Sequence, residues 1–229
     1  MEPPLAILSP HLDDAVLSCW HLLVGPGEVA VINVFAGIPP AGAPAGWWDR
    51  LTGHDDAQAL VRARRDEDRA ALALARREPV HLDFLDHQYR PGREPPAALA
   101  AALRQHLPAD ALVLAPAAVA PLPAAPLPAT MEEEPGKPHP DHVAVREAAL
   151  ALREQGFAVG LYADLPHATA GATPTWPEQA ELHDLTDGAF ADKLRAVRRY
   201  ATQVEILERA FGLRLEDPAL LGREVCWRA

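Results

Sequence analysis

Two short clusters of histidine and aspartate are the residues of this 229-residue chain whose types and spacing could do chemistry. Residues 11–14 read His-Leu-Asp-Asp, and residues 139–142 read His-Pro-Asp-His. In each cluster two candidate ligands stand three residues apart, so both can face one point at the start of a helix. Imidazole and carboxylate groups suit zinc, and a catalytic zinc site needs three protein ligands and one open position.

A structural role is the alternative for each cluster taken alone. Asp13 or Asp14 could cap a helix with His11 as a loop residue, and the second cluster could be a helix start with Pro140 at its first position. A cap accounts for one aspartate, but not for a histidine and two carboxylates together. Two such helix starts at one sheet edge favour a hydrolytic metal site.

The side chains of the two clusters fit metal-assisted hydrolysis of an amide or ester. A bound metal ion lowers the pKa of its water toward about 7. A spare carboxylate can take the water proton, and a spare histidine can protonate a leaving amine or stabilise an oxyanion. A helix N-terminus disfavours an imidazolium, so His139 as an acid would need support from a carboxylate such as Asp141. Such a site also accepts iron or manganese.

Strand and helix patterns alternate along the chain and predict how the clusters are positioned. The apolar patterns predict strands at 5–9, 29–35, 80–85, 111–115, 158–162 and 224–227, and helices at 14–23, 55–76, 96–106, 139–155 and 189–211. This alternation predicts an α/β fold, a parallel sheet with helices on both faces. In such sheets ligands bind outside the carboxyl ends of the strands, where both clusters are expected.

Length and composition favour a single domain over residues 1–229, with irregular loops at about 37–54 and 116–138. The formal net charge of −11 argues against nucleic acid or an anionic membrane as the main partner. The chain starts without a basic leader, and no apolar stretch approaches the roughly 20 residues of a membrane span. We therefore expect a cytoplasmic protein.

The motifs resemble those of the PIG-L/LmbE-like family of zinc-dependent deacetylases. The signature of that family is an apolar strand followed by His-Pro-Asp-Asp, and later His-Pro-Asp-His. Here Leu12 replaces the first proline, and the second motif is complete. The resemblance continues in order through residues 64–71, 83–90 and 193–203, so it spans nearly the whole chain. It implies a Rossmann-like, three-layer sandwich with a mostly parallel sheet.

The resemblance also implies roles for the residues of the two motifs. His11, Asp14 and His142 would bind zinc. Asp13 would be the general base, and His139 the acid or electrophilic helper.

Residues outside this set have weaker assignments. By resemblance, Arg64 would contact a polar substrate group. Asp86 follows the third predicted strand, so it could reach the sheet edge and either contact a sugar hydroxyl or support the site. Asp141 is expected to support the site residues and not to contact substrate. Trp47 and Trp48 could stack on a sugar or cover the core. Six further histidines are expected in structural or surface positions: His54, His81, His87, His106, His167 and His183. Of these, His167 follows a predicted strand and could line the pocket.

Besides Leu12, two further positions depart from the family pattern. Ala15 stands where many members have glutamate, so a carboxylate near the site is missing. Trp20 lies in Cys-Trp-His, where Cys-Gly-Gly is common, and this bulky side chain puts the local packing in doubt.

Members of the family deacetylate N-acetylglucosamine attached to inositol, malate, lipid or antibiotic aglycones. The resemblance therefore implies a zinc-dependent N-deacetylase that acts on a small N-acetylated sugar conjugate. One alternative is an amidase of a larger thiol- or glyco-conjugate, which would share the metal site and differ in the pocket. Another is a non-catalytic binding protein with the same fold, which would predict a damaged catalytic set. A homo-oligomer is compatible with the sequence.

Overall fold

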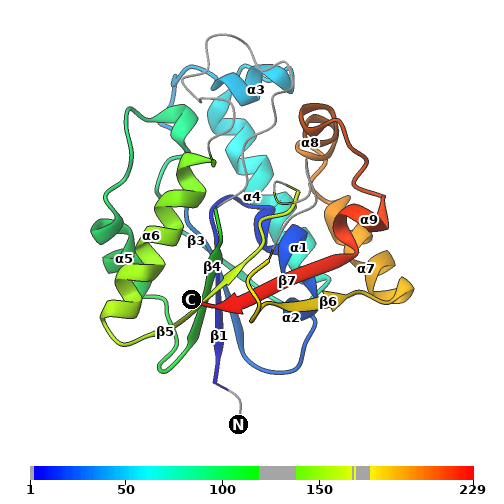
Figure 1. Cartoon of the computed structure of the whole chain (residues 1–229). Helices are drawn as coiled ribbons and strands as arrows, with labels where there is room; N and C mark the ends of the chain where they lie inside the picture. Colours follow the sequence, from blue (N-terminus) through cyan, green and yellow to red (C-terminus); the bar gives the residue numbers. More distant parts are fainter. Residues whose placement is uncertain (1–2, 119–137, 167, 169–175) are drawn as a thin grey trace.

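A seven-stranded sheet lies at the centre of the computed structural model, which describes residues 3–118, 138–166, 168 and 176–229. The strands are β1 (Leu5–Ser9), β2 (Val29–Asn33), β3 (Pro79–His81), β4 (Leu112–Pro116), β5 (Ala158–Tyr162), β6 (Glu181–Asp184) and β7 (Arg223–Arg228). Their order across the sheet is β3-β2-β1-β4-β5-β7-β6 (Figure 1). The predicted α/β class is confirmed.

Strands β3, β2, β1, β4 and β5 run parallel to one another, and β7 runs antiparallel to both β5 and β6. The sheet is therefore mostly parallel, as predicted. Strand β6 was not predicted. All four of its residues, Glu-Leu-His-Asp, are exposed, so it lacks the apolar pattern that marks a buried strand.

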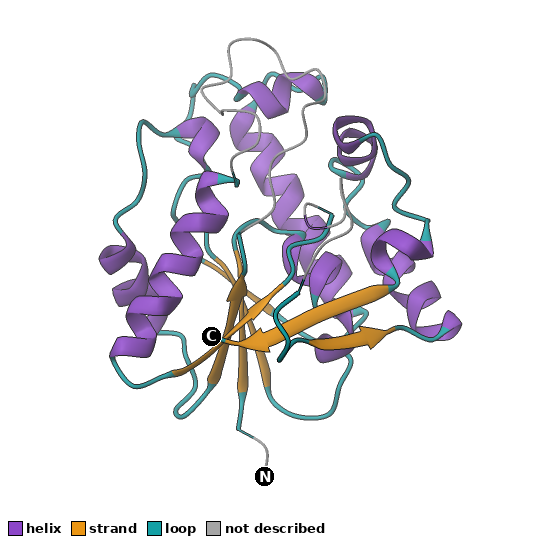
Figure 2. Ribbon diagram, viewed as in Figure 1, coloured by secondary structure: helices purple, strands orange, loops and turns teal. Residues whose placement is uncertain are grey.

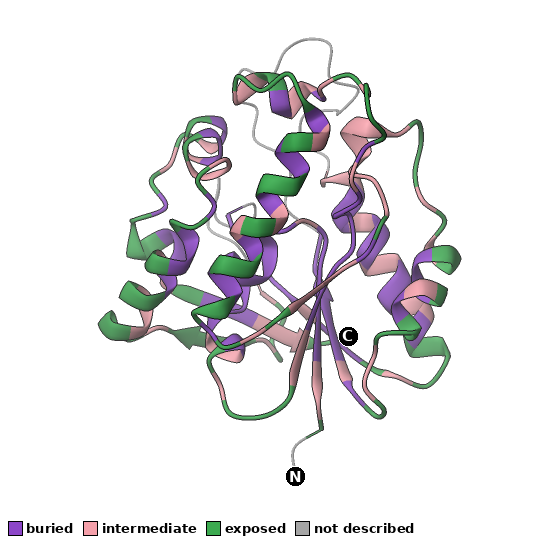
Figure 3. Ribbon diagram, turned by 180° about the vertical axis from the view of Figure 1, so that it is seen from behind, coloured by how far each residue is buried: buried purple, intermediate pink, exposed green. Residues whose placement is uncertain are grey.

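Helices cover both faces of the sheet (Figure 2). They are α1 (Asp14–Ser18), α2 (Trp20–Leu23), α3 (Trp47–Leu51), α4 (Ala57–Ala73), α5 (Pro96–Arg104), α6 (Pro140–Glu154), α7 (Asp187–Val197), α8 (Val204–Phe211) and α9 (Pro218–Leu221), with a 3₁₀ turn η1 (His87–Tyr89). Alternate strand residues bury on opposite faces, so Ile7 belongs to one core and Leu8 to the other. Figure 3 shows this burial along the strands.

The helix predicted at 14–23 is two helices, α1 and α2. Cys19 separates them with φ −133° and ψ 28°. The Glu224 carboxylate accepts the backbone N–H groups of Trp20 and His21, at 2.8 Å each, and so provides the N-terminus of α2 with acceptors. A contact from the far end of the chain thus divides this helix.

Two other element predictions need correction. The predicted 189–211 helix is α7 and α8, with a turn between them, and the predicted 37–54 loop contains α3. Most of the predicted 116–138 loop, residues 119–137, lies outside the described residues. Within the described part of the chain, no helix is long and apolar enough to cross a membrane.

The strand order places both motifs at one point of the sheet. From β1 the chain moves outward to β2 and β3, and it then returns to β4 on the other side of β1. Such a reversal opens a crevice at the carboxyl ends of the two central strands. The first cluster follows β1, and the second follows β4, so both border this crevice.

Candidate metal centre

The turn that leads from β1 into α1 is fixed by three hydrogen bonds. The Ser9 hydroxyl donates to the carbonyl oxygen of His11 at 2.6 Å and accepts the Ala15 N–H at 3.0 Å. The backbone N–H of His11 donates to Asp14 Oδ2 at 2.7 Å. These bonds hold the side chains of His11 and Asp14 on the same side of the turn, as their spacing predicted.

His11, Asp14 and His142 bring three donor atoms into a near-equilateral triangle. His11 Nδ1 lies 3.4 Å from Asp14 Oδ2, His142 Nε2 lies 3.4 Å from the same oxygen, and the two nitrogens are 3.3 Å apart. At zinc–ligand distances of about 2.0–2.1 Å, tetrahedral ligands stand about 3.3–3.4 Å from one another. The triangle therefore fits a tetrahedral cation with one remaining position.

His142 is oriented by a carboxylate that the sequence did not single out. Its Nδ1–H donates to Asp164 Oδ2 at 2.9 Å, and the Asp164 carboxylate also accepts the backbone N–H of Ala118. The bond at Nδ1 leaves Nε2 as the nitrogen that faces Asp14. The signal for Asp164 was its place just after a predicted strand at the same sheet edge.

The carboxylates around the triangle favour positive charge. Burial alone lowers the pKa of His11, but hydrogen bonds to Asp14 and Asp141 raise it well above its ordinary value. Burial alone raises the pKa of Asp14, but the charge of His142 and a hydrogen bond from His11 bring it far below its ordinary range. This positive charge can come from protons on the histidines or from a metal cation. A metal ion displaces those protons from its ligands when it binds.

Asp13 stands apart from this triangle. It occupies the position before α1, yet its side chain makes no capping hydrogen bond among the described residues, so the helix-cap alternative does not account for it. The carboxyl group is buried in the wall of the cavity described below. Burial, followed by the negative charge of Asp14, raises the pKa of Asp13 to about 6.

His139 is the N-terminal cap of α6. Its Nδ1 accepts the backbone N–H of Asp141 at 3.3 Å, so the capping alternative holds in part for this residue. Its ring lies 4.7 Å from that of His11 and 5.1 Å from that of His142, measured between centroids. The structure thus brings His139 to the same centre.

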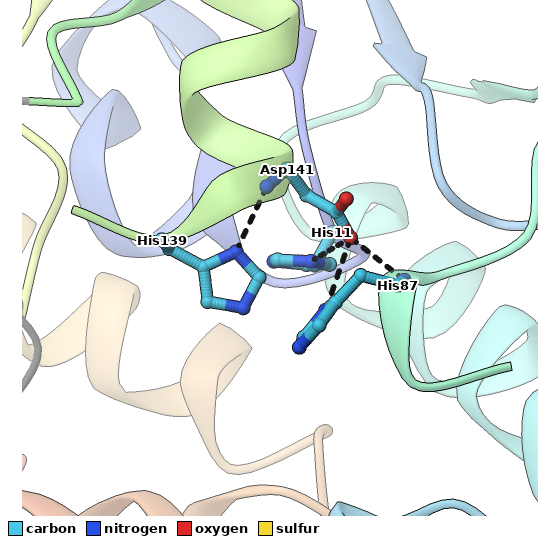
Figure 4. A group of neighbouring side chains, drawn as sticks. All are labelled: His11, His87, His139 and Asp141. Atoms are coloured by element: carbon cyan, nitrogen blue, oxygen red, sulfur yellow. Dashed lines mark hydrogen bonds and ion pairs between the residues drawn. The ribbon is translucent and has the colours of Figure 1, made fainter. Parts of the chain in front are cut away.

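Asp141 is fully buried, and its carboxylate faces His11 rather than the ring of His139 (Figure 4). Asp141 Oδ2 lies 3.3 Å from His11 Nε2 and accepts the His87 N–H at 3.0 Å, while Oδ1 pairs with Arg90. Burial raises the pKa of Asp141, but hydrogen bonds from His11 and His87 reverse this and lower it. The contact of Asp141 with His139 is the hydrogen bond from its backbone N–H to Nδ1.

The remaining predicted substrate residues also reach the cavity wall. The Arg64 guanidinium is buried and lies 3.2 Å from Asp49 Oδ1, while Asp49 Oδ2 accepts the Tyr89 hydroxyl at 2.6 Å. Asp86 accepts the backbone N–H and side-chain N–H of Gln88. Their predicted substrate contacts stay predictions.

An open cavity of about 1060 Å³, a volume that includes solvent at its mouth, lies over these residues. Polar groups of the site and apolar side chains both line it. The apolar wall has contributions from α3 and α8 and includes Phe35, Trp47, Trp48, Leu207, Ala210 and Phe211. The Trp48 Nε1–H donates to Gln203 Oε1 at 3.0 Å, and its ring packs on the core. Trp47 packs edge-on against Trp48 and is half-buried.

His87 was expected in a structural or surface position, and the structure places it at the cavity. Its ring lines the cavity and lies 4.6 Å from that of His139. The sequence signals for His87 were its place after the third predicted strand and within the 83–90 stretch that resembles the family. His81 is structural as predicted and hydrogen-bonds Asp68 at 2.7 Å. His167 lies outside the described residues.

The two departures from the family pattern are both accommodated in the core. Trp20 is buried among the side chains of the core on one face of the sheet, and Ala15 lies beside it.

No protein-family model matches the sequence, and no curated protein does. Solved structures do match. A triple mutant of a deacetylase of the teicoplanin biosynthetic pathway is 30% identical, with a TM-score of 0.74 over 98% of this chain and 97% of that chain. The zinc-inhibited form of the teicoplanin deacetylase Orf2 is 29% identical, with a TM-score of 0.73 over 99% and 98%. The pseudoaglycone deacetylase Dbv21 is 29% identical, with a TM-score of 0.73 over 100% and 97%.

Proposed function

Because this chain belongs to the PIG-L/LmbE-like family of deacetylases, we propose that it removes the acetyl group from an N-acetylglucosamine-type sugar in a small conjugate. The observation that carries this proposal is the donor triangle of His11, Asp14 and His142, with Asp13 and His139 beside it in one cavity. A triangle alone would suit a structural metal, but the two further groups supply what hydrolysis needs.

The donor set fits a divalent metal, and we propose zinc. Two imidazole nitrogens and one carboxylate oxygen at tetrahedral spacing match zinc, although iron and manganese accept the same ligands. When bound, such a cation supplies a Lewis acid for the amide carbonyl and makes water more acidic. Asp164 would hold His142 in the orientation that this ligation requires.

Asp13 is proposed as the general base. It is the carboxylate of the first motif that lies outside the triangle, and it borders the cavity. It would take a proton from the attacking water and deliver it to the amine nitrogen as the C–N bond breaks, which yields acetate and the free amino sugar.

His139 is proposed as a neutral donor to the oxyanion. Its Nδ1 accepts the Asp141 N–H, so the ring proton resides on Nε2. In a cationic ring Nδ1 would also carry a proton, and this N–H would face the N–H of Asp141. The N-terminus of α6 also disfavours a positive charge. Of the two roles implied by the resemblance, the geometry thus favours the electrophilic helper.

The apolar wall supports a sugar that carries an apolar or aromatic aglycone. Trp47 and Phe211 would contact the aglycone, while Arg64 and Asp86, which also line the cavity, would contact the sugar. Solved relatives named for teicoplanin and a pseudoaglycone agree with such a substrate. We propose a glycoconjugate of this kind, with its identity to be fixed by assay.

The test is acetate release from a panel of amides by the zinc-loaded chain. N-acetylglucosamine, its aryl and alkyl glycosides, and N-acetylated thiol conjugates cover the leading function and the amidase alternative. We expect the glycosides to be hydrolysed fastest. Preference for the thiol conjugates would instead support the amidase, and a zinc-loaded chain that hydrolyses none of the panel would contradict the proposal. Loss of turnover in His142→Ala, with loss of zinc, is the matched control.

A further inference from the structure

One buried aspartate, Asp49 of α3, joins three segments that surround the cavity. Its side chain is fully buried. Its Oδ1 lies 3.2 Å from Nη2 of Arg64, on α4, and its Oδ2 accepts the Tyr89 hydroxyl of η1 at 2.6 Å. Arg64 and Tyr89 are part of the cavity lining, and Asp49 contacts both of them from outside that lining. Asp49 can therefore act on a bound ligand through its neighbours.

The helix α3 offers a simpler role for Asp49. Asp49 is the third residue of α3, and its Oδ2 accepts the backbone N–H of Gly46, the residue before the helix, at 3.0 Å. This bond is half of a capping box, which stabilises a helix start. A cap accounts for the contact with Gly46, but it does not account for the contacts with Arg64 and Tyr89.

The two oxygens of this carboxylate have separate partners. Oδ2 is held by the Tyr89 hydroxyl and the Gly46 N–H, while Oδ1 faces Arg64. Burial raises the pKa of Tyr89, and the hydrogen bond to Asp49 adds to this although the charge of Arg64 opposes it. The hydroxyl therefore stays protonated and keeps donating to Oδ2, so that Oδ1 remains directed at Arg64.

The guanidinium of Arg64 is held at one end and meets the cavity at the other. Its Nε and Nη2 are buried and form no hydrogen bond with the described residues, so the charge of Asp49 is what orients Nη2. The remaining nitrogen, Nη1, is the one through which the group borders the cavity. Because the guanidinium is planar, fixing Nη2 also fixes the direction of Nη1.

A second buried ion pair of this chain shows what a purely structural pair looks like. Lys193 Nζ donates to the Glu224 carboxylate at 2.6 Å and to the carbonyl oxygen of Leu221 at 2.9 Å, and neither charged residue lines the cavity. Arg64 differs on both counts, since it borders the cavity and keeps a donor there. An acceptor on a bound ligand would use that donor.

We propose that Asp49 is a positioning residue for sugar binding, which holds Nη2 of Arg64 so that Nη1 donates a hydrogen bond to a hydroxyl of the sugar. This inference rests on the proposed function, because it takes the ligand to be an N-acetylated sugar. Asp49 does not belong to the donor triangle of the metal site. Loss of its charge should therefore weaken sugar binding and leave metal binding nearly unchanged.

The test is a double-mutant cycle with Asp49→Asn and Arg64→Gln in the zinc-loaded chain, followed by calorimetry. The ligand is the phenyl glycoside of glucosamine, which keeps the sugar hydroxyls and has no acetyl group to hydrolyse. We expect each single variant to bind it about tenfold more weakly. The double variant should bind it no more weakly than Arg64→Gln alone, because Asp49 acts through Arg64. Additive losses, unchanged binding in Asp49→Asn, or a native chain that does not bind the ligand overturn the proposal.

A second variant keeps the test decisive if Asp49→Asn fails to fold or to retain zinc. Tyr89→Phe keeps the ion pair and removes the hydroxyl that holds Oδ2, so we expect binding about threefold weaker. This loss should vanish beside Arg64→Gln, and a loss of equal size in both backgrounds overturns the proposal. The matched control is Asp66→Asn, which breaks an exposed pair with Arg69 on the same helix and should bind as the native chain does.

Kinetics distinguish a positioning role from a catalytic one. For the phenyl glycoside of N-acetylglucosamine, KM of Asp49→Asn should rise about tenfold, while kcat changes less than about threefold. A fall in kcat at unchanged KM would overturn the positioning role. Because the calorimetric ligand is not hydrolysed, a chain without deacetylase activity would contradict the proposed function and still give the result for Asp49.

Discussion

Asp164 Oδ2 lies 2.9 Å from His142 Nδ1, so a carboxylate after β5 fixes the ring of a proposed metal ligand on α6. The Asp164 carboxylate is itself held by the N–H of Ala118, after β4. The carboxyl ends of two neighbouring strands thereby set which nitrogen of His142 faces Asp14. The position of this ligand depends on the sheet as well as on its own helix.

Replacement of Asp164 should weaken the metal site without removing a ligand. In Asp164→Asn we expect metal affinity to fall about 10–100-fold, because the ring loses its charged acceptor. Competition with a chromophoric chelator measures this. Asp187→Asn, at an exposed aspartate, is the control. Unchanged affinity in Asp164→Asn would show that the ring is oriented by its packing alone.

Replacement of Asp13 should separate chemistry from metal binding. We expect Asp13→Asn to keep its metal and to lose about 10²–10⁴-fold in turnover, because an amide cannot accept the water proton. Elemental analysis and acetate release give the two readouts, with Asp55→Asn as the control at an exposed site. Full turnover in Asp13→Asn would remove it from the mechanism.

Disruption of a buried ion pair outside the cavity lining should lower the stability of the fold. Lys193 Nζ lies 2.6 Å from Glu224 Oε1, and both side chains are fully buried. Removal of one partner leaves a buried charge, so Lys193→Met should lower the free energy of unfolding by about 3–5 kcal/mol. The double variant Lys193→Met/Glu224→Gln should recover part of that loss in urea titrations. A double variant as unstable as the sum of the singles would argue against coupling.

The ionisation of Glu224 should also make the stability of the fold sensitive to acid. Burial raises its pKa, but the Lys193 charge and the hydrogen bonds from His21 reverse this and lower the pKa to about 2 from its ordinary 4.5. The unfolded chain then takes up the proton first on acidification. This contribution is therefore complete above about pH 4.5 and is lost as the pH falls toward about 2; its size is on the order of 3 kcal/mol.

Urea unfolding at about pH 6 and about pH 3 measures this contribution. The native chain should lose more stability over that interval than Glu224→Gln, which lacks the titrating group. Equal losses would assign the acid response to other carboxyl groups.

Replacement of Trp47 should change the KM of a substrate by an amount that depends on its aglycone. It forms part of the apolar wall and is half-buried. In Trp47→Ala we expect KM to rise about tenfold for glycosides with an aromatic aglycone, and little for N-acetylglucosamine itself. Trp176→Ala, outside the cavity wall, is the control. An equal effect on both substrates would indicate that Trp47 supports the site as a whole.

Much of the fold followed from local pattern. The β-branched run at 29–35 and the apolar run at 5–9 predicted strands, because strands buried on both faces need continuous apolar residues. The elements that were missed depend on distant contacts. The break at Cys19 is stabilised by Glu224, 204 residues away from Trp20, and the exposed strand β6 is held by its pairing with β7.

The sequence by itself determined the chemistry that is possible here: two His/Asp clusters, each at the start of a helix and each after a strand. Tertiary structure alone decided their relationship. The alignment of β1 beside β4 brings His142 within 3.3 Å of His11, and the packing of β5 adds Asp164. The turn η1 adds His87, which belongs to neither cluster, to the cavity wall. Such contacts are set by how strands and helices pack, and local sequence carries little information about that packing.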